Sequence, residues 1–78
     1  MVKVRLKRQE FDVALVKRNL SQRRLAIKLG MSRAYLSQIV TGKRQPSAFM
    51  RERLLDFFKG YSFDDLFAIE ENGQQTND

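Results

Sequence analysis

Residues 33–41 combine an apolar stripe with hydrogen-bonding side chains on the other side. Leu36, Ile39 and Val40 lie at helical spacing and are expected to face a core. The opposite side then carries groups that can bond to the edges of DNA bases: an arginine bonds both acceptors of guanine, a glutamine bonds adenine, a serine is versatile, and an alanine methyl touches the thymine methyl. The candidates for such base contacts are Arg33, Ala34, Ser37 and Gln38.

The residue types missing from the chain exclude several kinds of site. The sequence contains no cysteine and no histidine. Disulfides and thiolate metal sites are therefore excluded, and zinc hydrolysis and histidine-based acid–base catalysis lose their usual groups. We expect no enzymatic activity, no catalytic residue, no bound metal and no cofactor.

The charge of the chain is unevenly distributed. All fifteen Lys and Arg residues lie between Lys3 and Lys59, and only four acidic residues oppose them up to residue 63, which gives that part a net charge of +11. Residues 64–78 hold five acids and no base. A basic body predicts a polyanionic partner, and the alternative is a basic balance that serves solubility alone.

The chain is expected to form one small domain that stays in the cytoplasm. Its 78 residues are near the lower limit for a self-sufficient core. The longest apolar runs have only a few residues, far fewer than the ~20 that span a membrane. The start, Met-Val-Lys-Val-Arg-Leu, is charged and lacks the apolar region of a signal peptide. These features predict a cytoplasmic protein of bacterial or phage type with no membrane partner.

Serine and glycine residues mark the ends of five predicted helices. Ser21, Ser32 and Ser47 are expected N-caps, because their hydroxyls can accept from the unpaired amides of a first turn. Gly30 and Gly60 are expected to end helices, since the residue after a helix often needs a positive φ. The expected helices cover residues 9–19, 22–29, 33–41, 48–59 and 62–66. Core candidates outside residues 33–41 are Phe11, Ala14, Leu15, Val16, Leu25, Ala26, Leu29, Phe49, Met50, Leu54, Leu55, Phe57 and Phe58.

The two ends of the ordered chain are predicted to form strands. Val2, Val4 and Leu6 alternate with basic residues, and residues 67–71 also alternate. We expect the two segments to pair as a short ribbon, within one chain or exchanged across a dimer, with Lys3 and Arg5 facing Glu70 or Glu71. Disorder of both termini is the alternative. Residues 72–78 are predicted to be a disordered tail.

The spacing of small and apolar residues in 22–41 predicts a helix-turn-helix. Ala26 has the small side chain that a close helix crossing requires, and Gly30 begins the turn four residues later. Leu36 and Ile39 follow Ala26 by ten and thirteen residues and would hold the second helix against the core. A helical bundle with coincident Ala and Gly positions is the alternative.

The quoted motifs together resemble those of the Cro/CI (lambda-repressor-like) regulators. The similar segments are Leu-Ser-Gln at 20–22, Ala-x-x-x-Gly at 26–30 and Tyr-Leu-Ser-Gln-Ile…Gly-Lys-Arg-Gln-Pro at 35–46, within a similarity from about residue 9 to 67. The resemblance implies an all-α, five-helix helix-turn-helix domain over residues 1–71, to which the terminal ribbon is added. The sequence departs from the family pattern at Val40, where an acidic residue is frequent. We also expect no second domain, as in short Cro-like proteins of phages and mobile elements.

The resemblance also implies a set of contacts to the DNA backbone. The amides at the start of residues 22–29 can bind a phosphate, and polar groups beside and after residues 33–41 suit the backbone. For Arg33 a contact to phosphate alone is the alternative to base recognition, and for Tyr35 the alternative is surface packing. The predicted phosphate contacts are Ser21, Gln22, Arg23, Tyr35, Thr41, Lys43 and Arg44.

These observations predict a sequence-specific transcriptional regulator, specifically a repressor that binds a palindromic operator in double-stranded DNA as a homodimer. The apolar run Leu54, Leu55, Phe57, Phe58, Phe63, Leu66 and Phe67 exceeds what so small a core requires, which favours a weak dimer that is firmer on DNA. Two alternatives remain open. One is an antitoxin with a toxin or other protein antagonist as partner, and the other is an architectural or excision factor that bends DNA.

Overall fold

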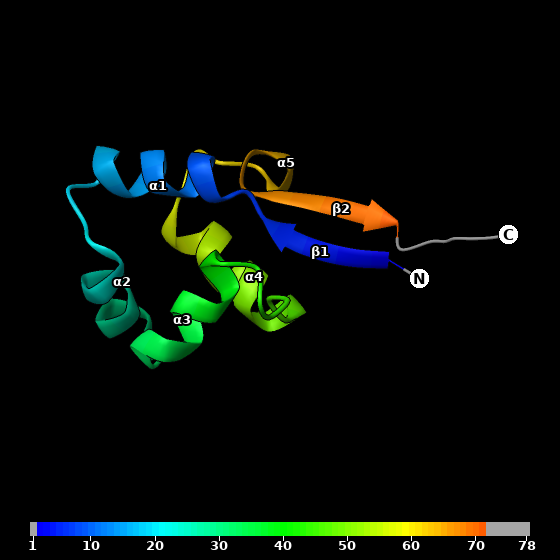
Figure 1. The fold of residues 1–78 in the computed structure, drawn as a ribbon. Helices are drawn as coiled ribbons and strands as arrows, with labels where there is room; N and C mark the ends of the chain where they lie inside the picture. Colours follow the sequence, from blue (N-terminus) through cyan, green and yellow to red (C-terminus); the bar gives the residue numbers. More distant parts are fainter. Residues whose placement is uncertain (1, 72–78) are drawn as a thin grey trace, which may run out of the picture.

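The computed structural model describes residues 2–71, and the predicted disordered tail at 72–78 lies outside the described residues. Five helices stand between two terminal strands (Figure 1). The elements in chain order are β1 (Val2–Leu6), α1 (Arg8–Lys17), α2 (Gln22–Leu29), α3 (Arg33–Val40), α4 (Ala48–Phe57), α5 (Phe63–Leu66) and β2 (Phe67–Glu71). The predicted five-helix architecture with a terminal ribbon is confirmed. No helix within residues 2–71 is both long and apolar enough to cross a membrane.

The predicted serine caps are confirmed. The hydroxyls of Ser21, Ser32 and Ser47 each accept a hydrogen bond from the amide three residues later, over 3.0–3.1 Å. Ser62 caps α5 reciprocally with Asp65, whose carboxylate accepts from the Ser62 amide over 2.8 Å. Each cap satisfies an amide that has no partner within its own helix, so the starts of α2 to α5 are encoded locally.

Three helix ends differ by one or two residues from the prediction. The first helix ends at Lys17 rather than residue 19, because Asn19 adopts a left-handed conformation with φ 56°. The third ends at Val40, and Thr41 is its C-cap. The fourth ends at Phe57, because Phe58 leaves helical geometry at φ −94° and ψ 66° and buries its ring completely. Gly60, the expected terminator, lies in the turn that follows.

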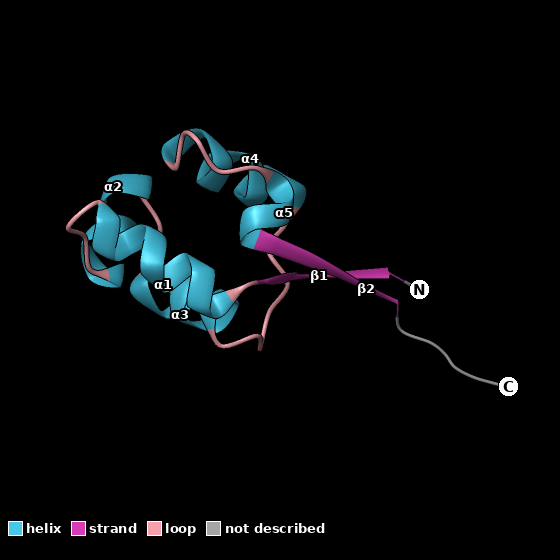
Figure 2. Cartoon of the chain, turned by 90° about the horizontal axis from the view of Figure 1, so that it is seen from above, coloured by secondary structure: helices cyan, strands magenta, loops and turns pink. Residues whose placement is uncertain are grey.

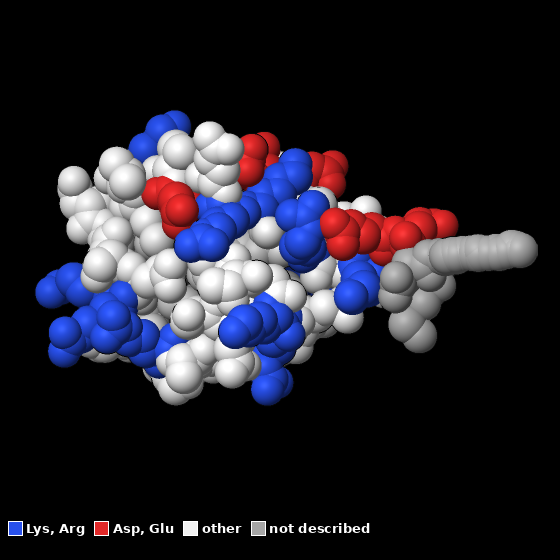
Figure 3. All heavy atoms as spheres, viewed as in Figure 1, with Lys and Arg blue, Asp and Glu red and all other residues white. Residues whose placement is uncertain are grey.

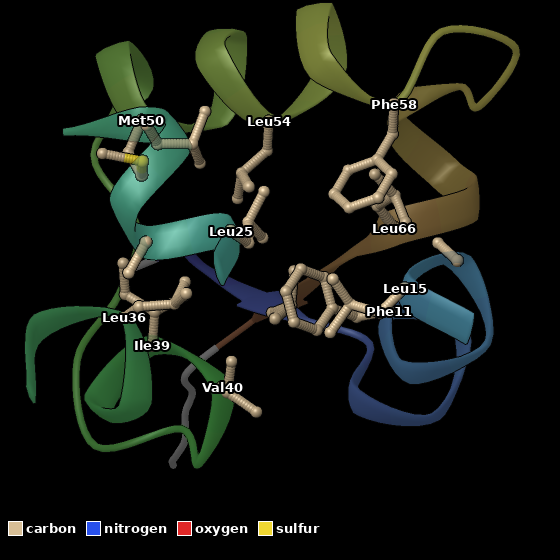
Figure 4. Packing of buried hydrophobic residues seen from close by; sticks show 14 of the residues in the cluster. Phe11, Leu15, Leu25, Leu36, Ile39, Val40, Met50, Leu54, Phe58 and Leu66 are labelled. Atoms are coloured by element: carbon tan, nitrogen blue, oxygen red, sulfur yellow. The ribbon is translucent and has the colours of Figure 1, made fainter. Parts of the chain in front are cut away.

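The core lies where α1, α3, α4 and α5 converge, with α2 closing one side (Figure 4). Its members are all hydrophobic, and the described residues include no buried polar side chain. Phe11 of α1 packs edge-to-face on Phe58, with ring centroids 5.9 Å apart and an interplanar angle of 77°, an arrangement that aromatic pairs favour. Nearby, the guanidinium of Arg18 donates to the carbonyl oxygens of Phe57 and Lys59 and so satisfies the end of α4.

Four predicted core residues are not fully buried. Val16 is 73% exposed and Phe49 is 67% exposed, while Leu55 and Phe57 are half-buried. Helical geometry explains the two exposed residues. Met50 and Leu54 of α4 and its C-cap Phe58 are buried at intervals of four residues, and Phe49 lies about 100° around the helix from this stripe. The stripe of α1 is buried at residues 11, 14 and 15, and Val16 lies one step beyond it.

β1 and β2 pair antiparallel within one chain, as predicted. The register sets Lys3 opposite Glu70, Val4 opposite Ile69 and Leu6 opposite Phe67. Arg5 contacts Glu70 diagonally, with Nε and Oε2 2.6 Å apart. The apolar face of the ribbon packs on the helices through Leu6 and Phe67, which are buried, and through Val4, which is partly buried. Beyond these residues the ribbon projects away from the helices (Figure 2).

Candidate DNA interface

α2 and α3 form the helix-turn-helix that the spacing predicts. A three-residue turn, 30–32, joins the two helices. Gly30 ends α2 at φ 69°, a conformation that side chains rarely adopt. The Met31 amide donates to the Ala26 carbonyl over 3.0 Å, and the Ala26 side chain is only 3% exposed. The small residue therefore stands inside the bend, where a larger one would separate the helices.

α3 presents all of the predicted base contacts to solvent. Its inner side buries Leu36, Ile39 and Val40, which are at most 3% exposed. The outward side carries the four predicted side chains in two successive turns, and each of them is exposed. The exposed residues are Arg33, Ala34, Ser37 and Gln38. An exposed helix side with one guanidinium, one amide and small groups between them has the groups that read base edges, and a major groove admits an α-helix.

A linked group of three side chains stands at the C-terminal end of α3. Nε of Arg44 donates to Oε1 of Gln38 over 3.1 Å, and the Arg44 guanidinium lies 5.3 Å from the centre of the Tyr35 ring. The Gln38 carbonyl oxygen also accepts from the amides of Lys43 and Arg44. The loop after α3 thus folds back on the helix through a turn at Gly42, with φ 84°. This group orients the Gln38 amide before any ligand binds.

The coupling of Gln38 to Arg44 was not foreseen, because sequence reasoning assigned one to bases and the other to phosphate. A signal was present: a glycine with positive φ after the helix reverses the chain and can return residue 44 to residue 38. Thr41 is also engaged, since its hydroxyl donates to the Ser37 carbonyl over 2.9 Å. The Thr41 hydroxyl can donate to a DNA phosphate only if its hydrogen bond to the Ser37 carbonyl breaks.

The remaining predicted phosphate contacts lie at the start of α2 and in the loop after α3. Ser21 and Arg23 are exposed and Gln22 is half-buried at the start of α2, while Lys43 is exposed in the α3–α4 loop. The Ser21 hydroxyl accepts a hydrogen bond from the Arg24 amide. A phosphate at the start of α2 would therefore bind the other amides of the first turn of α2.

Charge separates along the molecule. Between Asp12 and Glu52 the sequence has nine basic residues and no acid, and this stretch includes all of α2 and α3. Figure 3 shows basic side chains around the end of the molecule that holds α2 and α3, whereas acidic ones gather along α5 and β2. A polyanion is therefore attracted to the end that holds α2 and α3, whereas on the ribbon Lys3 and Arg5 offset the charges of Glu70 and Glu71.

Comparisons with known proteins agree with this geometry. A sequence model of the helix-turn-helix family matches residues 14–66. The chain is 31% identical over 68 residues to YvzC of Bacillus subtilis (strain 168), described as an uncharacterized HTH-type transcriptional regulator, and the alignment covers 87% of each chain. No solved structure matches the chain significantly.

Proposed function

The chain belongs to the Cro/CI-type helix-turn-helix family of DNA-binding transcriptional regulators, and from this premise we propose that it is a repressor that reads a palindromic operator as a homodimer. The observation that carries the proposal is the exposed side of α3, where four side chains able to contact bases stand within an acid-free basic stretch. In this proposal α3 enters the major groove and its N-terminal residues meet the base edges.

Each side chain has a role that follows from its chemistry. Arg33, in the first turn of α3, has the reach and the planar fork to bond O6 and N7 of one guanine. Ser37 lies four residues later on the same side and can bond to a neighbouring base, while the Ala34 methyl can contact thymine. Lys43 and the start of α2 bind phosphates on either side and so fix the register of α3.

The linked group at the end of α3 refines the role of Gln38. The Oε1 atom of Gln38 accepts from Arg44, so the two N–H donors of its Nε2 group point toward solvent. Such an amide donates to an acceptor on a base edge, and the second lone pair of Oε1 can still accept from adenine N6. Arg44 then has two roles: its Nε group orients Gln38, and its remaining N–H groups bind the phosphate backbone of the DNA.

The small size of the DNA interface of one copy supports a dimer, and occupancy of the operator is sufficient for repression. One α3 reads only a few base pairs, so discrimination among many genomic sites needs two copies on a two-fold symmetric operator. Occupying an operator that overlaps a promoter excludes polymerase and requires no surface other than the DNA interface.

The test is selection of bound sequences from random double-stranded DNA with the full chain. We expect an enriched inverted repeat with a guanine in each half, and a binding stoichiometry of two protomers per site. Enrichment of bent or flexible sequences without an inverted repeat would instead indicate an architectural factor. Absence of any enrichment would refute sequence-specific recognition.

A further inference from the structure

The loop between α3 and α4, residues 41–47, is held at both of its ends. Near its start, the Gln38 carbonyl accepts from two amides of the loop over 2.9 and 3.1 Å. Near its end, the Pro46 side chain is buried. Between these two anchors the loop carries Lys43 and Arg44, both predicted to contact phosphate. The path of the loop therefore determines where these two positive charges lie relative to α3.

A third anchor joins the loop to the N-terminal strand. Oε1 of Gln45 accepts from the Val4 amide over 2.9 Å, and the two residues are 41 positions apart in the sequence. In an antiparallel pair, alternate residues point their backbone groups toward the partner strand and the others point them outward. The Lys7 amide donates to the Leu66 carbonyl over 2.7 Å and continues the ladder, so by alternation the Val4 amide points outward. Gln45 thus gives this amide the partner that β2 cannot supply.

The two edges of the terminal ribbon therefore differ. The loop covers the outer edge of β1 at Val4, whereas the outer edge of β2 lies on the other side of the ribbon, away from α3 and α4 (Figure 1). By the same alternation Ile69 is an outward residue of β2, and within residues 2–71 no hydrogen bond engages its backbone at that edge. Of the two strands, β1 is the one that contacts the loop with the predicted phosphate contacts.

β1 is the fixed partner in this contact, and the loop is the part that it holds. β1 pairs with β2 over its whole length, Leu6 is 2% exposed, and Val4 packs partly against the core. The loop leaves α3 through Gly42 at φ 84°, and glycine has the widest choice of backbone conformations. The bond to β1 lies three residues beyond Gly42 and so restricts the paths available to Lys43 and Arg44 in the free protein.

We propose that Gln45 is a positioning residue for DNA binding, which holds the α3–α4 loop on β1 and so directs Lys43 and Arg44 to the DNA backbone. The inference rests on the proposed function, because it assigns a role within the same interface. Strand β1, which carries no predicted DNA contact, then contributes to DNA affinity through the loop. Because Arg44 also donates to Oε1 of Gln38, the same bond supports the orientation of the Gln38 amide.

The test removes the hydrogen bond from each side in the full chain. Gln45→Met keeps the length of the side chain and lacks a strong acceptor. Val4→Pro removes the outward amide without removing a ladder bond to β2. Val2→Pro makes the same change at the next outward position of β1 and is the control. Each variant, and the double variant, is titrated by fluorescence anisotropy against the selected site and against random duplex DNA over a range of salt concentrations.

We expect Gln45→Met and Val4→Pro each to weaken binding to both DNAs about two- to tenfold, the effect of one neutral hydrogen bond. The double variant should lose no more than the single variant with the larger loss, because both changes remove the same bond. The salt slope should fall by about 1, since a displaced loop loses a phosphate contact. Val2→Pro should bind like the wild type. Additive losses, wild-type affinity of Gln45→Met, or a loss at an unchanged salt slope would overturn the proposal.

Amide exchange in the free protein tests the bond without DNA. The Val4 amide should exchange about two- to tenfold faster in Gln45→Met than in the wild type, while the amides of α1 stay unaltered. Gln45→Glu, whose carboxylate still accepts a hydrogen bond, should keep the Val4 amide protected. Equal exchange of the Val4 amide in Gln45→Met and in the wild type would refute the anchor.

The positioning role and the proposed function fail separately. If the wild type binds the selected site no better than random duplex DNA, the proposed function fails. The cycle on random DNA then still decides the role of Gln45, because that DNA presents the same phosphates. If the wild type is sequence-specific but the losses are additive, the proposed function stands and Gln45 has no positioning role. A wild type that binds neither DNA would refute both.

Discussion

α3 and the terminal ribbon differ in how far their apolar side chains are buried. α3 buries Leu36, Ile39 and Val40 almost completely, so that its solvent side is polar or small. The ribbon buries Leu6 and Phe67, packs Val4 partly against the core, and leaves Val2 and Ile69 more than half exposed. A polar surface on a basic background suits a hydrated polyanion, whereas exposed apolar groups beside an open strand edge suit a protein. The comparison shows that two regions of one small domain present different surfaces, one polar and basic and the other partly apolar.

The largest expected effect concerns the crossing that supports the α3 surface. Ala26→Leu adds methylene groups where α2 bends into α3, and such overpacking typically costs about 1–3 kcal/mol. For a domain of this size each kcal/mol lowers the Tm by about 4–8 °C. We expect a clear fall of the melting temperature by circular dichroism. Ala34→Leu makes the same change on the exposed side of α3 and should leave the Tm nearly unaltered, and equal Tm values for both variants would contradict the assigned crossing.

The second effect distinguishes base recognition from phosphate binding at α3. Arg33→Ala should weaken binding to the selected site by about 1–3 kcal/mol, with a much smaller loss on scrambled DNA, because a bidentate base contact is specific and a phosphate contact is not. Arg8→Ala, which removes the same charge from exposed α1, is the control. Equal losses for Arg33→Ala on both DNAs would make Arg33 a phosphate contact.

A smaller effect concerns the group formed by Tyr35, Gln38 and Arg44. Arg44→Lys keeps the positive charge but loses the Nε donor to Gln38 and the planar stack on Tyr35. We expect discrimination at one base pair of each half-site to fall by about 0.5–1.5 kcal/mol, with an unchanged dependence of affinity on salt. Lys43→Ala is the opposite case, since it should reduce the salt slope by about 1 and leave base preference intact. If Arg44→Lys and Lys43→Ala change base discrimination and the salt slope in the same way, the positioning role of Arg44 is refuted.

The smallest effect lies in the ribbon. Glu70→Gln removes the Arg5 ion pair, whose side chains are about half exposed at 48% and 47%. Such pairs contribute about 0–1 kcal/mol, and salt screens them. Urea unfolding at low protein concentration should show a loss within that range at low salt and none at ~1 M salt, where the Debye length is ~3 Å. A loss that persists in high salt would indicate that Glu70 supports the ribbon in another way.

Local features of the sequence predicted most of this fold. Serine hydroxyls followed by apolar periodicity place α2, α3 and α4 within a residue or two of their observed bounds, because capping involves only neighbouring residues. The ribbon was predicted from alternation at the two ends of the chain. Ala26, Gly30, Leu36 and Ile39 identified the helix-turn-helix, since their spacing is determined by one rigid bend.

Features that depend on distant packing were not predicted. Phe58 ends α4 because its ring enters the core beside Phe11. The residues next to Phe58 in the sequence give no sign of this helix end. Phe49 is as apolar as Met50 but faces solvent, because only three-dimensional packing decides which of two adjacent residues turns inward. The bond from Arg44 to Gln38 depends on the path of a loop, and the different exposure of the two ribbon edges depends on where Gln45 lies.

The central claim is that the exposed side of α3 reads base edges, and a double-mutant cycle between Arg33 and one guanine tests it most directly. Replacing that guanine in the selected site by 7-deazaguanine removes the N7 acceptor and leaves the base pair intact. Wild-type and Arg33→Ala proteins are each titrated against both DNAs by fluorescence anisotropy. A direct contact predicts a coupling energy of about 1 kcal/mol or more, with the variant indifferent to the modification. Additive losses would contradict base reading by Arg33.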